Sequence, residues 1–389
     1  WWLRLPKPVR NFLFISPEYR KMSQTTAAQT HSFQTEVKQL LQLMIHSLYS
    51  NKEVFLRELI SNGSDACDRL RFAALTDASL MEDGETLGLK VSFDKNEKTV
   101  TIMDNGIGMT ADEVIENIGT IARSGTRQFL DALSGDAAND ANLIGQFGVG
   151  FYSAFLVAKK VELTTRHAGE PVDAGVRWVS DGEGEYTIES VEVTERGTII
   201  TIYLRDEDKE FAEDFRLRGI ISRYSDHISL PIEMPSEEKE KKGEWESVNS
   251  GSALWSRPKT EISEEEYQRF YQSLSYDSEA PLATLHNRVE GNLEYTSLLF
   301  IPQKASFDLW DREQRHGINL YVRRIFIMDD SKYLMPSYLR FVRGVVDAAD
   351  LPLNVSREFL QNNKDIDRIR SASVKKILSE LSRLAEKEP

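Results

Sequence analysis

The sequence predicts an α+β protein, with helices over one face of a largely antiparallel sheet in a first domain and an α/β arrangement in a second. Two observations support this fold class. Apolar residues recur at helical spacing in two segments between residues 33 and 72. Several short runs farther along the chain alternate between apolar and polar residues, which is typical of strands with one buried face.

In the first domain, helices are expected from Phe33 to Tyr49 and from about Lys52 to Phe72. Leu89–Phe93 and Thr99–Met103 alternate on either side of a polar turn, which predicts a β-hairpin. Further strands are expected at Lys160–Arg166, Gly175–Val179, Tyr186–Val193 and Thr198–Leu204. These strands would make up the sheet that the two helices cover.

A charged run around Ser236–Glu246 breaks all periodicity and predicts a solvated linker at 236–250. The first domain would then span 22–235 and the second 251–389. In the second domain, strands are expected near Tyr295–Ile301 and Ile318–Ile327, and helices near Glu264–Leu274 and Asp365–Ala385.

Residues 1–21 mix aromatic residues, prolines and basic residues without helical periodicity, and Met22 follows them. A targeting segment is one interpretation of these basic residues. The stretch has no continuous apolar region and no clean amphipathic pattern, which favours an extension that is disordered or not native to the protein.

Composition excludes several classes of protein. With 40% hydrophobic and 28% charged residues over 389 positions, the chain is typical of a soluble globular protein with two or three domains. A net charge of −14 argues against nucleic acid as the main partner. No apolar run reaches the roughly 20 residues that span a bilayer, so no membrane partner is expected. The single cysteine, Cys67, is expected to be a buried thiol and fits a reducing, cytoplasmic location.

The first of three motifs runs from Glu58 to Asp65. Glu58 and Asn62 are four residues apart on the second helix, so their side chains share a face, with Asp65 one turn farther. Asn62 offers a neutral oxygen to Mg²⁺, and Glu58 could take a proton from water. Gly63 in mid-helix costs about 1 kcal/mol relative to alanine and indicates close approach by another group. By itself, such a polar stripe is most often only a solvated surface.

The second motif, Asp104–Met109, follows a predicted strand directly. Gly106 and Gly108 would let the backbone approach a ligand without obstruction by a Cβ atom. Asp104 can accept a hydrogen bond from an exocyclic amine, which would favour adenine over guanine. An ordinary Asp-Asn-Gly turn is the alternative.

The third motif, Gly145–Phe151, precedes an apolar helix expected at Tyr152–Ala158. Backbone N–H groups that enter a helix N-terminus form an anion site. Neither glycine-rich motif is a Walker loop or a complete dinucleotide fingerprint. Gly119–Thr126 and the small-residue stretch Ser134–Asn142 are typical of a mobile lid with glycine hinges.

In this order, the motifs resemble the Bergerat-type nucleotide site shared by gyrase, MutL, histidine kinases and the ninety-kilodalton heat-shock chaperones. The longer spellings Tyr49–Asn62, Ile118–Thr126 and Leu353–Glu358 resemble the chaperone family, most closely in its bacterial form. The resemblance covers about Phe33 to Gln361. It implies a two-layer α/β sandwich ATPase domain, followed by part of an α/β middle domain.

The resemblance also implies roles for individual residues. Glu58 would activate the attacking water, Asn62 would reach Mg²⁺ and phosphate, and Asp104 would bind the adenine amine. Arg357 would reach the γ-phosphate when the domains dock, and Gln361, four residues later, could face the same way. The other residues expected at the ATP/ADP site are Asp65, Ala66, Gly108, Met109, Asn117, Arg123, Ser124, Gly125, Gln146, Phe147, Gly148, Val149, Gly150, Phe151 and Thr198. Arg123 stands where many relatives have lysine, which leaves its contact undefined.

The implied function is that of an ATP-dependent molecular chaperone of the heat-shock response, which hydrolyses ATP slowly with lid closure and domain docking. Its partners would be client proteins and cochaperones. Relatives form homodimers through a domain that is expected to be missing after Pro389.

Two alternatives to this function remain. One is a nucleotide-binding holdase or scaffold with negligible ATPase activity. The other is a histidine kinase core, although no helix with a suitably placed phosphoacceptor histidine precedes the site. Trp255, Phe307, Leu309 and Trp310 are expected to be core residues, with contact to clients as the alternative.

Overall fold

The computed structural model describes residues 39, 42, 49, 51–81, 84–126, 143, 145, 147–236, 243–275, 277–291, 293–304, 317–329, 333–349, 351 and 364–387. Every structural statement below concerns these residues. Several predictions lie outside them: the extension 1–21, the lid stretch 134–142, and the residues Gln146, Phe307, Leu309, Trp310, Arg357 and Gln361. Of the helix expected at 33–49, Gln39, Gln42 and Tyr49 are described; Gln39 and Gln42 are helical, whereas Tyr49 is not.

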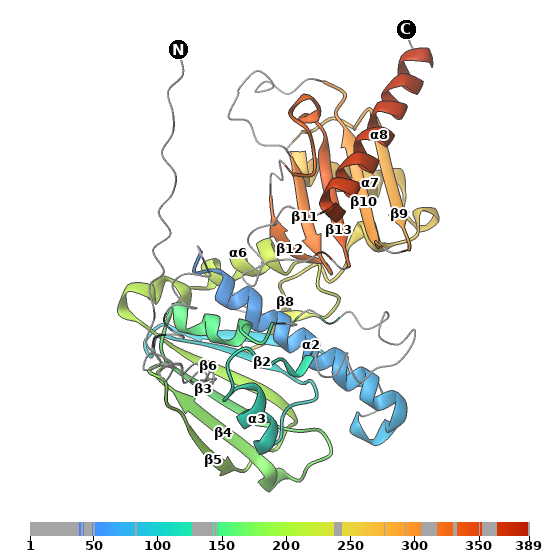
Figure 1. Cartoon of the computed structure of the whole chain (residues 1–389). Helices are drawn as coiled ribbons and strands as arrows, with labels where there is room; N and C mark the ends of the chain where they lie inside the picture. The colour runs from blue at the N-terminus through green and yellow to red at the C-terminus, as the bar shows by residue number, and fades with distance from the viewer. Residues whose placement is uncertain are drawn as a thin grey trace, which may run out of the picture. The chain divides into compact units, whose positions relative to one another are not determined.

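An eight-stranded sheet forms the centre of the first domain (Figure 1). Its strands are β1 (Leu89–Asp94), β2 (Thr99–Asp104), β3 (Ala158–Arg166), β4 (Gly175–Ser180), β5 (Thr187–Val191), β6 (Gly197–Leu204), β7 (Ile232–Pro235) and β8 (Trp245–Ser247). They are arranged in the order β5-β4-β3-β6-β2-β1-β7-β8. Each neighbouring pair is antiparallel except β1 and β7, which are parallel. The prediction of a largely antiparallel sheet with an N-terminal hairpin is confirmed.

Helices cover one face of this sheet, and α2 (Val54–Thr76) is the longest of those described in the first domain. The described part of this domain also contains the α-helices α3 (Ala111–Asn117) and α6 (Asp214–Tyr224). Phe55, Leu59 and Leu70 on α2 are almost fully buried, because this side of the helix packs on the sheet. Short 3₁₀ helices are η2 (Ala78–Leu80), η3 (Gly150–Leu156), η4 (Val172–Ala174) and η5 (Asp206–Ala212). The two-layer α/β arrangement is therefore confirmed.

The segment after the third motif differs from its prediction. An α-helix was expected at Tyr152–Ala158, whereas the chain forms the 3₁₀ helix η3, and Ala158 already begins β3. All residues from Phe151 to Leu156 are buried. Because such a run is apolar on every side, its periodicity does not distinguish an α-helix from other compact structure.

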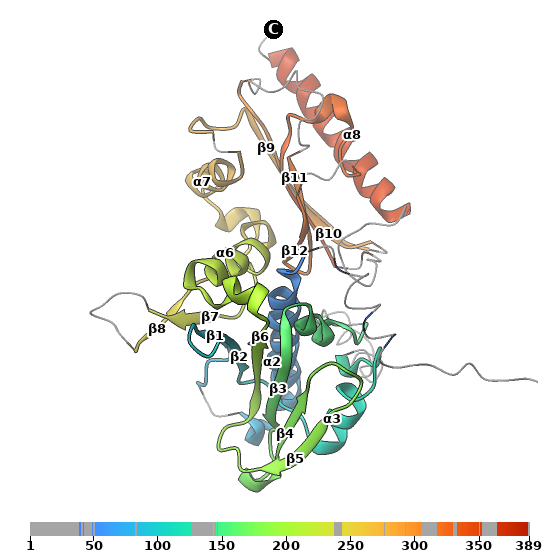
Figure 2. The ribbon, with the colours of Figure 1, turned by 90° about the vertical axis from the view of Figure 1, so that its left-hand side faces the viewer.

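Part of the expected linker belongs to the first sheet. Trp245–Ser247 forms β8 and pairs with β7, so that Trp245 lies opposite Pro235 (Figure 2). The ammonium group of Lys90 lies 5.1 Å from the centre of the Trp245 ring, which adds a cation–π contact to this edge. The domain boundaries at 235 and 251 stay predictions.

The second domain is built on a five-stranded sheet in the order β12-β11-β13-β10-β9. Its strands are β9 (Ala283–Val289), β10 (Tyr295–Ile301), β11 (Ile318–Val322), β12 (Ile325–Met328) and β13 (Arg343–Ala348). The helices α7 (Glu264–Ser275) and α8 (Lys364–Lys387) lie on opposite faces of it (Figure 2). Its 3₁₀ helices are η7 (Leu254–Ser256), η8 (Lys259–Glu261) and η9 (Ser337–Leu339). Both predicted helices and the strand Tyr295–Ile301 are confirmed.

The single strand expected at Ile318–Ile327 is instead a hairpin of β11 and β12. Arg323 and Arg324 form its turn, with positive φ angles of 51° and 65°. Such turns usually contain glycine or asparagine, so the sequence carries no turn signal here. Asp347 compensates in part, because its carboxylate accepts a hydrogen bond from the backbone N–H of Arg324 at 3.2 Å.

Two predictions about single residues are also confirmed. Cys67 is a free, fully buried thiol, and its pKa is raised well above the usual value, mainly by burial. Trp255 is 1% exposed and belongs to the core of the second domain. Among the described helices, none is long and apolar enough to cross a membrane.

Candidate functional site

The three motifs meet at one cavity of about 150 Å³ in the first domain. It is enclosed by α2, by the ends of β2 and β6, by the segments 107–109 and 147–151, and by Gly145. Predicted site residues that line it are Glu58, Asn62, Asp65, Ala66, Asp104, Gly108, Met109, Asn117, Arg123, Ser124, Gly125, Phe147, Gly148, Val149, Gly150, Phe151 and Thr198. Gln146, Arg357 and Gln361 lie outside the described residues. The structure thus places residues from far apart in the chain around one space.

The floor of the cavity is apolar because of the register of three strands. Ile102 on β2 lies opposite Ile200 on β6, and Ile200 lies opposite Leu163 on β3. All three residues line the cavity. A flat row of aliphatic side chains can cover one face of an aromatic ring and exclude water from it.

Asp104 lies at the end of the next cross-strand row. It pairs with Thr198, which in turn lies opposite Thr165. The carboxylate of Asp104 accepts a hydrogen bond from the backbone N–H of Gly106 at 3.0 Å. Burial raises the pKa of Asp104 to about 7, although this hydrogen bond and one from the backbone of Thr198 oppose the rise. The site therefore holds a carboxyl group that is poised between its two protonation states at neutral pH.

Glu58 forms a buried ion pair with its neighbour Arg57. The Nη2 and Nε atoms of Arg57 donate to Oε1 of Glu58 at 2.8 and 3.1 Å. Both side chains are at most 5% exposed. A paired cation favours the ionised carboxylate, which is the form that can accept a proton.

Gly150 makes room for the Glu58 carboxylate. A Cβ atom added at residue 150 would lie only 2.7 Å from Oε2 of Glu58. Any side chain at this position would therefore displace the carboxylate or the backbone. The last glycine of the third motif is explained by its contact with the first motif.

Asp65 links α2 to both sides of the segment 127–142. Its Oδ2 atom accepts from the backbone N–H of Gly145 at 2.7 Å and from the hydroxyl of Thr126 at 3.3 Å. Asn62 lies nearby, since a Cβ atom on Gly145 would be 3.4 Å from its Oδ1. Asp65 thus holds Thr126, in the first part of the expected lid, and Gly145, which follows its second part.

Gly63 and Gly106 both serve packing inside the protein, which agrees with the close approach expected at Gly63 but differs from the ligand approach expected at Gly106. A Cβ on Gly63 would lie 2.6 Å from Cδ2 of Leu89, so the partner that approaches α2 is strand β1. A Cβ on Gly106 would lie 2.5 Å from the carbonyl carbon of Ala66 on α2. Gly108 has a φ of +67° and packs on the backbone of Arg166, although it also lines the cavity.

Arg123 and Asn117 border the cavity in different ways. The guanidinium group of Arg123 is paired with Glu116 at 2.8 Å and is 42% exposed. Within the described part of the chain, Oδ1 of Asn117 is buried and accepts no hydrogen bond. Such an acceptor is expensive to bury unless a partner binds there, so it fits a ligand with hydrogen-bond donors or ordered water.

The donor set fits a metal ion only together with a ligand. Among the described residues, no group of three or more His, Cys, Asp or Glu side chains is placed to hold one. Mg²⁺ commonly takes one or two protein ligands and completes its shell with water and phosphate oxygens. The Asn62 amide oxygen is compatible with that arrangement.

Sequence reasoning missed several residues that line the cavity. Arg69 continues the helical stripe of Glu58, Asn62 and Asp65, so extending that stripe by one turn would have found it. The apolar residues Leu59, Ile102, Ile107, Ile118, Leu163 and Ile200 were also missed, as were Gly63 and Thr126 as lining residues. The floor residues carry no such signal, because they come together only through the strand order.

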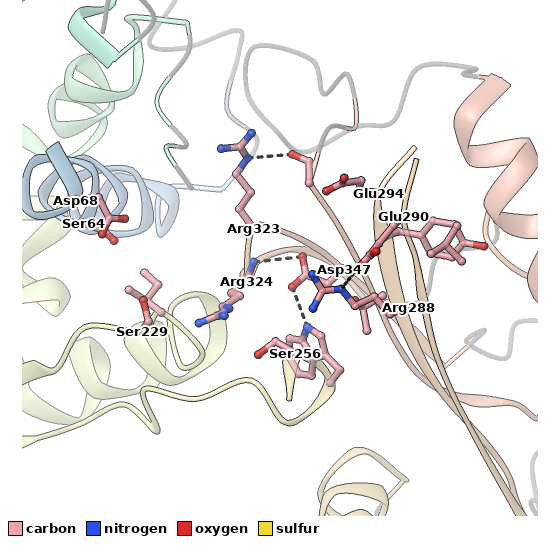
Figure 3. A pocket seen from close by; sticks show the side chains of 16 residues that line it. Ser64, Asp68, Ser229, Ser256, Arg288, Glu290, Glu294, Arg323, Arg324 and Asp347 are labelled. Carbon is pink, nitrogen blue, oxygen red and sulfur yellow. Dashed lines mark hydrogen bonds and ion pairs between the residues drawn. The ribbon is translucent and has the colours of Figure 1, made fainter. Parts of the chain in front are cut away.

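A larger cavity, of about 250 Å³, lies elsewhere and is lined by charged residues from both domains (Figure 3). Several of these charged groups already hold ion pairs or hydrogen bonds within the protein. Arg288 pairs with Glu290 at 2.9 Å, and Asp347 accepts from Nε1 of Trp255 at 2.8 Å. It contains neither glycine-rich motif, so the smaller cavity remains the candidate site.

Comparisons with known proteins agree with this geometry. Residues 49–202 match a family described as "Histidine kinase-, DNA gyrase B-, and HSP90-like ATPase", and residues 235–389 match one described as "Hsp90 protein". The chain is 62% identical to the chaperone protein HtpG of Nitrosococcus oceani and 61% identical to that of Nitrosospira multiformis, over 94% of its length in each case. It is 58% identical to HtpG of Shewanella amazonensis over 92%. It spans 59%, 58% and 58% of these three relatives, respectively.

Proposed function

Because the chain belongs to the Hsp90 family, we propose that it is the nucleotide-binding and middle part of an ATP-driven molecular chaperone. One observation supports this most directly: a single cavity joins an apolar floor, the Asp104 carboxyl and the Glu58–Arg57 pair. These are the groups needed to hold a purine base at one end and to activate water at the other.

Asp104 would select adenine. A carboxylate accepts a hydrogen bond from the exocyclic amine of adenine, whereas guanine presents a carbonyl oxygen at that position, which would be repelled. The row of Ile102, Ile200 and Leu163 would cover one face of the base. Such a charge-assisted hydrogen bond is worth about 1.5–3 kcal/mol, which corresponds to roughly 10- to 150-fold in affinity.

The phosphates would lie against the third motif, where Gly148 and Gly150 bring the backbone close to the cavity. Mg²⁺, bound through Asn62, would neutralise charge on the phosphate oxygens. Glu58 would orient the attacking water and take its proton, and the buried Arg57 would keep the Glu58 carboxylate ionised. A positioned general base contributes about 10²- to 10⁴-fold to such a rate.

Lid closure and domain docking complete the proposal. The lid would comprise Gly119–Thr126 and Ser134–Asn142, and the bonds of Asp65 to Thr126 and Gly145 support its attachment to α2. Arg357, assisted by Gln361, would then approach the γ-phosphate from the second domain and offset charge that develops there. Both residues enter this proposal through the family resemblance alone.

In the cell, ATP turnover would drive the remodelling of client proteins in the cytoplasm, with cochaperones as further partners and a homodimer as the full-length form. The alternative function is a nucleotide-binding holdase or scaffold that hydrolyses ATP negligibly. The two functions differ in whether Glu58 accelerates phosphate release from bound ATP, which a comparison of the unmodified chain with Glu58→Ala measures.

Nucleotide binding can be tested by calorimetry with ATP and GTP. We expect ATP to bind and GTP to bind at least tenfold more weakly, because Asp104 repels its carbonyl oxygen. Asp104→Asn should weaken ATP binding by about 10- to 100-fold without loss of the fold. Asp173→Asn, at an exposed aspartate away from the cavity, is the matched control and should bind as the unmodified chain does.

Equal affinity of the Asp104→Asn variant and the unmodified chain for ATP would refute the adenine role. Equal affinity for ATP and GTP would argue against base recognition in this cavity altogether.

A further inference from the structure

The start of α2 contains more buried charge than the nucleotide site explains. Glu53, Arg57 and Glu58 are 8%, 1% and 4% exposed, and all lie within six residues. Burying charged groups is costly unless each is paired and hydrogen-bonded. Arg57 and Glu58 pair with each other, whereas Glu53 is held by a separate set of donors.

Tyr224, at the end of α6, lies between these groups and is 6% exposed. Its hydroxyl donates to Oε2 of Glu53 at 3.0 Å and accepts from Nδ2 of Asn51 at 3.1 Å. The Arg57 guanidinium lies 5.9 Å from the centre of the Tyr224 ring. Tyr224 therefore contacts both Glu53 and the cation that pairs with Glu58.

The same ring contacts the second domain. Tyr224 and Phe326 on β12 pack edge to face, with ring centres 5.8 Å apart. Arg223 lies 5.2 Å from the Tyr224 ring and 6.0 Å from the Phe326 ring. Its guanidinium is 3.7 Å from Glu53 and 3.6 Å from Asp329, which follows β12 directly. Strand β12 thus contacts the residues that surround Arg57.

We infer that Tyr224 is a positioning residue for Glu58, which acts through Arg57 and which responds to strand β12 through Phe326. Displacement of Phe326 would move the Tyr224 ring, and with it one wall of the site that holds the Arg57 guanidinium. Arg57 donates two hydrogen bonds to a single oxygen of Glu58, so a shift of the guanidinium reorients the carboxylate. This inference rests on the proposed function only where it concerns hydrolysis.

The first test compares Tyr224→Leu, which removes the ring, with Tyr224→Phe, which keeps it. We expect Tyr224→Leu to lower kcat for phosphate release about tenfold while the affinity for ATP stays within about twofold, a difference of roughly 1.4 kcal/mol in the barrier. Tyr224→Phe should retain most of the rate, because the ring still packs on Arg57 and Phe326. Tyr295→Leu is the matched control, since Tyr295 is another buried tyrosine, 8% exposed, on β10. It should leave kcat unchanged.

A second readout needs neither nucleotide nor activity. The readout is a ¹³C NMR titration of the labelled chain without nucleotide. The titration midpoint of the Glu58 carboxyl should rise in Tyr224→Leu, because the Arg57 cation that pairs with it is held less firmly. It should stay unchanged in Tyr224→Phe and Tyr295→Leu. Phe326→Leu, which leaves Tyr224 intact, should shift the midpoint in the same direction by a smaller amount. This variant provides a test even if Tyr224→Leu fails to fold.

The outcomes separate the two proposals. An active unmodified chain whose kcat survives Tyr224→Leu would overturn the inference, as would an unchanged Glu58 midpoint in both Tyr224→Leu and Phe326→Leu. An inactive unmodified chain in which the midpoint shifts as expected would support the positioning of Glu58 and overturn only its role in hydrolysis.

Discussion

At the scale of single residues, the site depends on two carboxyl groups in opposite environments. The Glu58 carboxylate is buried against the cation of Arg57. Asp104 is buried beside backbone N–H donors, and its pKa is raised to about 7. Groups whose surroundings differ in this way can perform different tasks at the same pH. Here one is suited to accept a proton from water, and the other to recognise an amine.

The raised pKa of Asp104 predicts how nucleotide affinity depends on pH. The ionised carboxylate is a stronger acceptor for the adenine amine than the protonated carboxyl is, so below about pH 7 ATP binding favours release of this proton. Affinity should therefore rise with pH, by up to about tenfold per unit below pH 7, and level off near pH 8. Calorimetry in buffers of different ionisation enthalpy would show proton release on binding.

Asp104→Asn is the control for this pH dependence, since it removes the titrating group while the phosphates of ATP still titrate. A slope that persists in the variant would assign the effect to the nucleotide.

The raised pKa of Asp104 also affects the stability of the folded chain, with a defined sign. The folded chain holds this proton more tightly than the unfolded chain, so the contribution of Asp104 to the free energy of unfolding falls as the pH rises from about 4 to about 7.

At the scale of elements, α2 shows where sequence patterns suffice and where they do not. Its helical periodicity and its polar stripe of Glu58, Asn62 and Asp65 are properties of neighbouring residues, and both are found in the structure. The floor of Ile102, Ile200 and Leu163 depends on the order β3-β6-β2. The local pattern around each of these residues predicts only a buried position in a strand. It does not predict that the three lie side by side, because a single sequence does not specify which strands pair.

Mid-helix glycines on α2 and α6 provide a matched pair of substitutions. Gly63→Ala should lower the free energy of unfolding by about 1–3 kcal/mol, because the added methyl meets the Leu89 side chain at 2.6 Å. Gly219→Ala should raise it by about 0.5–1 kcal/mol, since nothing lies within 4 Å of that Cβ position. Urea unfolding with an unchanged m value is the measurement.

Opposite signs for these two alanines are the essential result. A gain of stability in both variants would contradict the close contact between α2 and β1 at Gly63. If both lose it by similar amounts, the open position of Gly219 on α6 is wrong.

At the scale of the whole molecule, the two domains contact each other near the start of helix α2, and the same helix lines the candidate site. Tyr224 and Arg223 contact Phe326 and Asp329, and they also surround Glu53 and Arg57 at the start of α2. Sequence reasoning anticipated coupling between the domains only through Arg357. It did not identify this junction, because its members come from three segments whose proximity no local pattern encodes.

The turn at Arg323 and Arg324 was missed for a related reason. Its positive φ angles oppose the local preferences of arginine and are held in part by Asp347, which is more than 20 residues away. Local rules therefore predicted the elements and the motif residues. They did not predict the places where tertiary contacts override those rules.

We propose that this chain binds ATP in the motif-lined cavity and uses Glu58 to hydrolyse it. The most direct measurement is phosphate release by the unmodified chain and by Glu58→Ala, with ATP affinity determined on the same samples. We predict that both bind ATP, and that the variant releases phosphate about 100-fold more slowly or not at all. Equal rates of phosphate release at saturating ATP would rule out Glu58 as the general base and favour a nucleotide-binding scaffold.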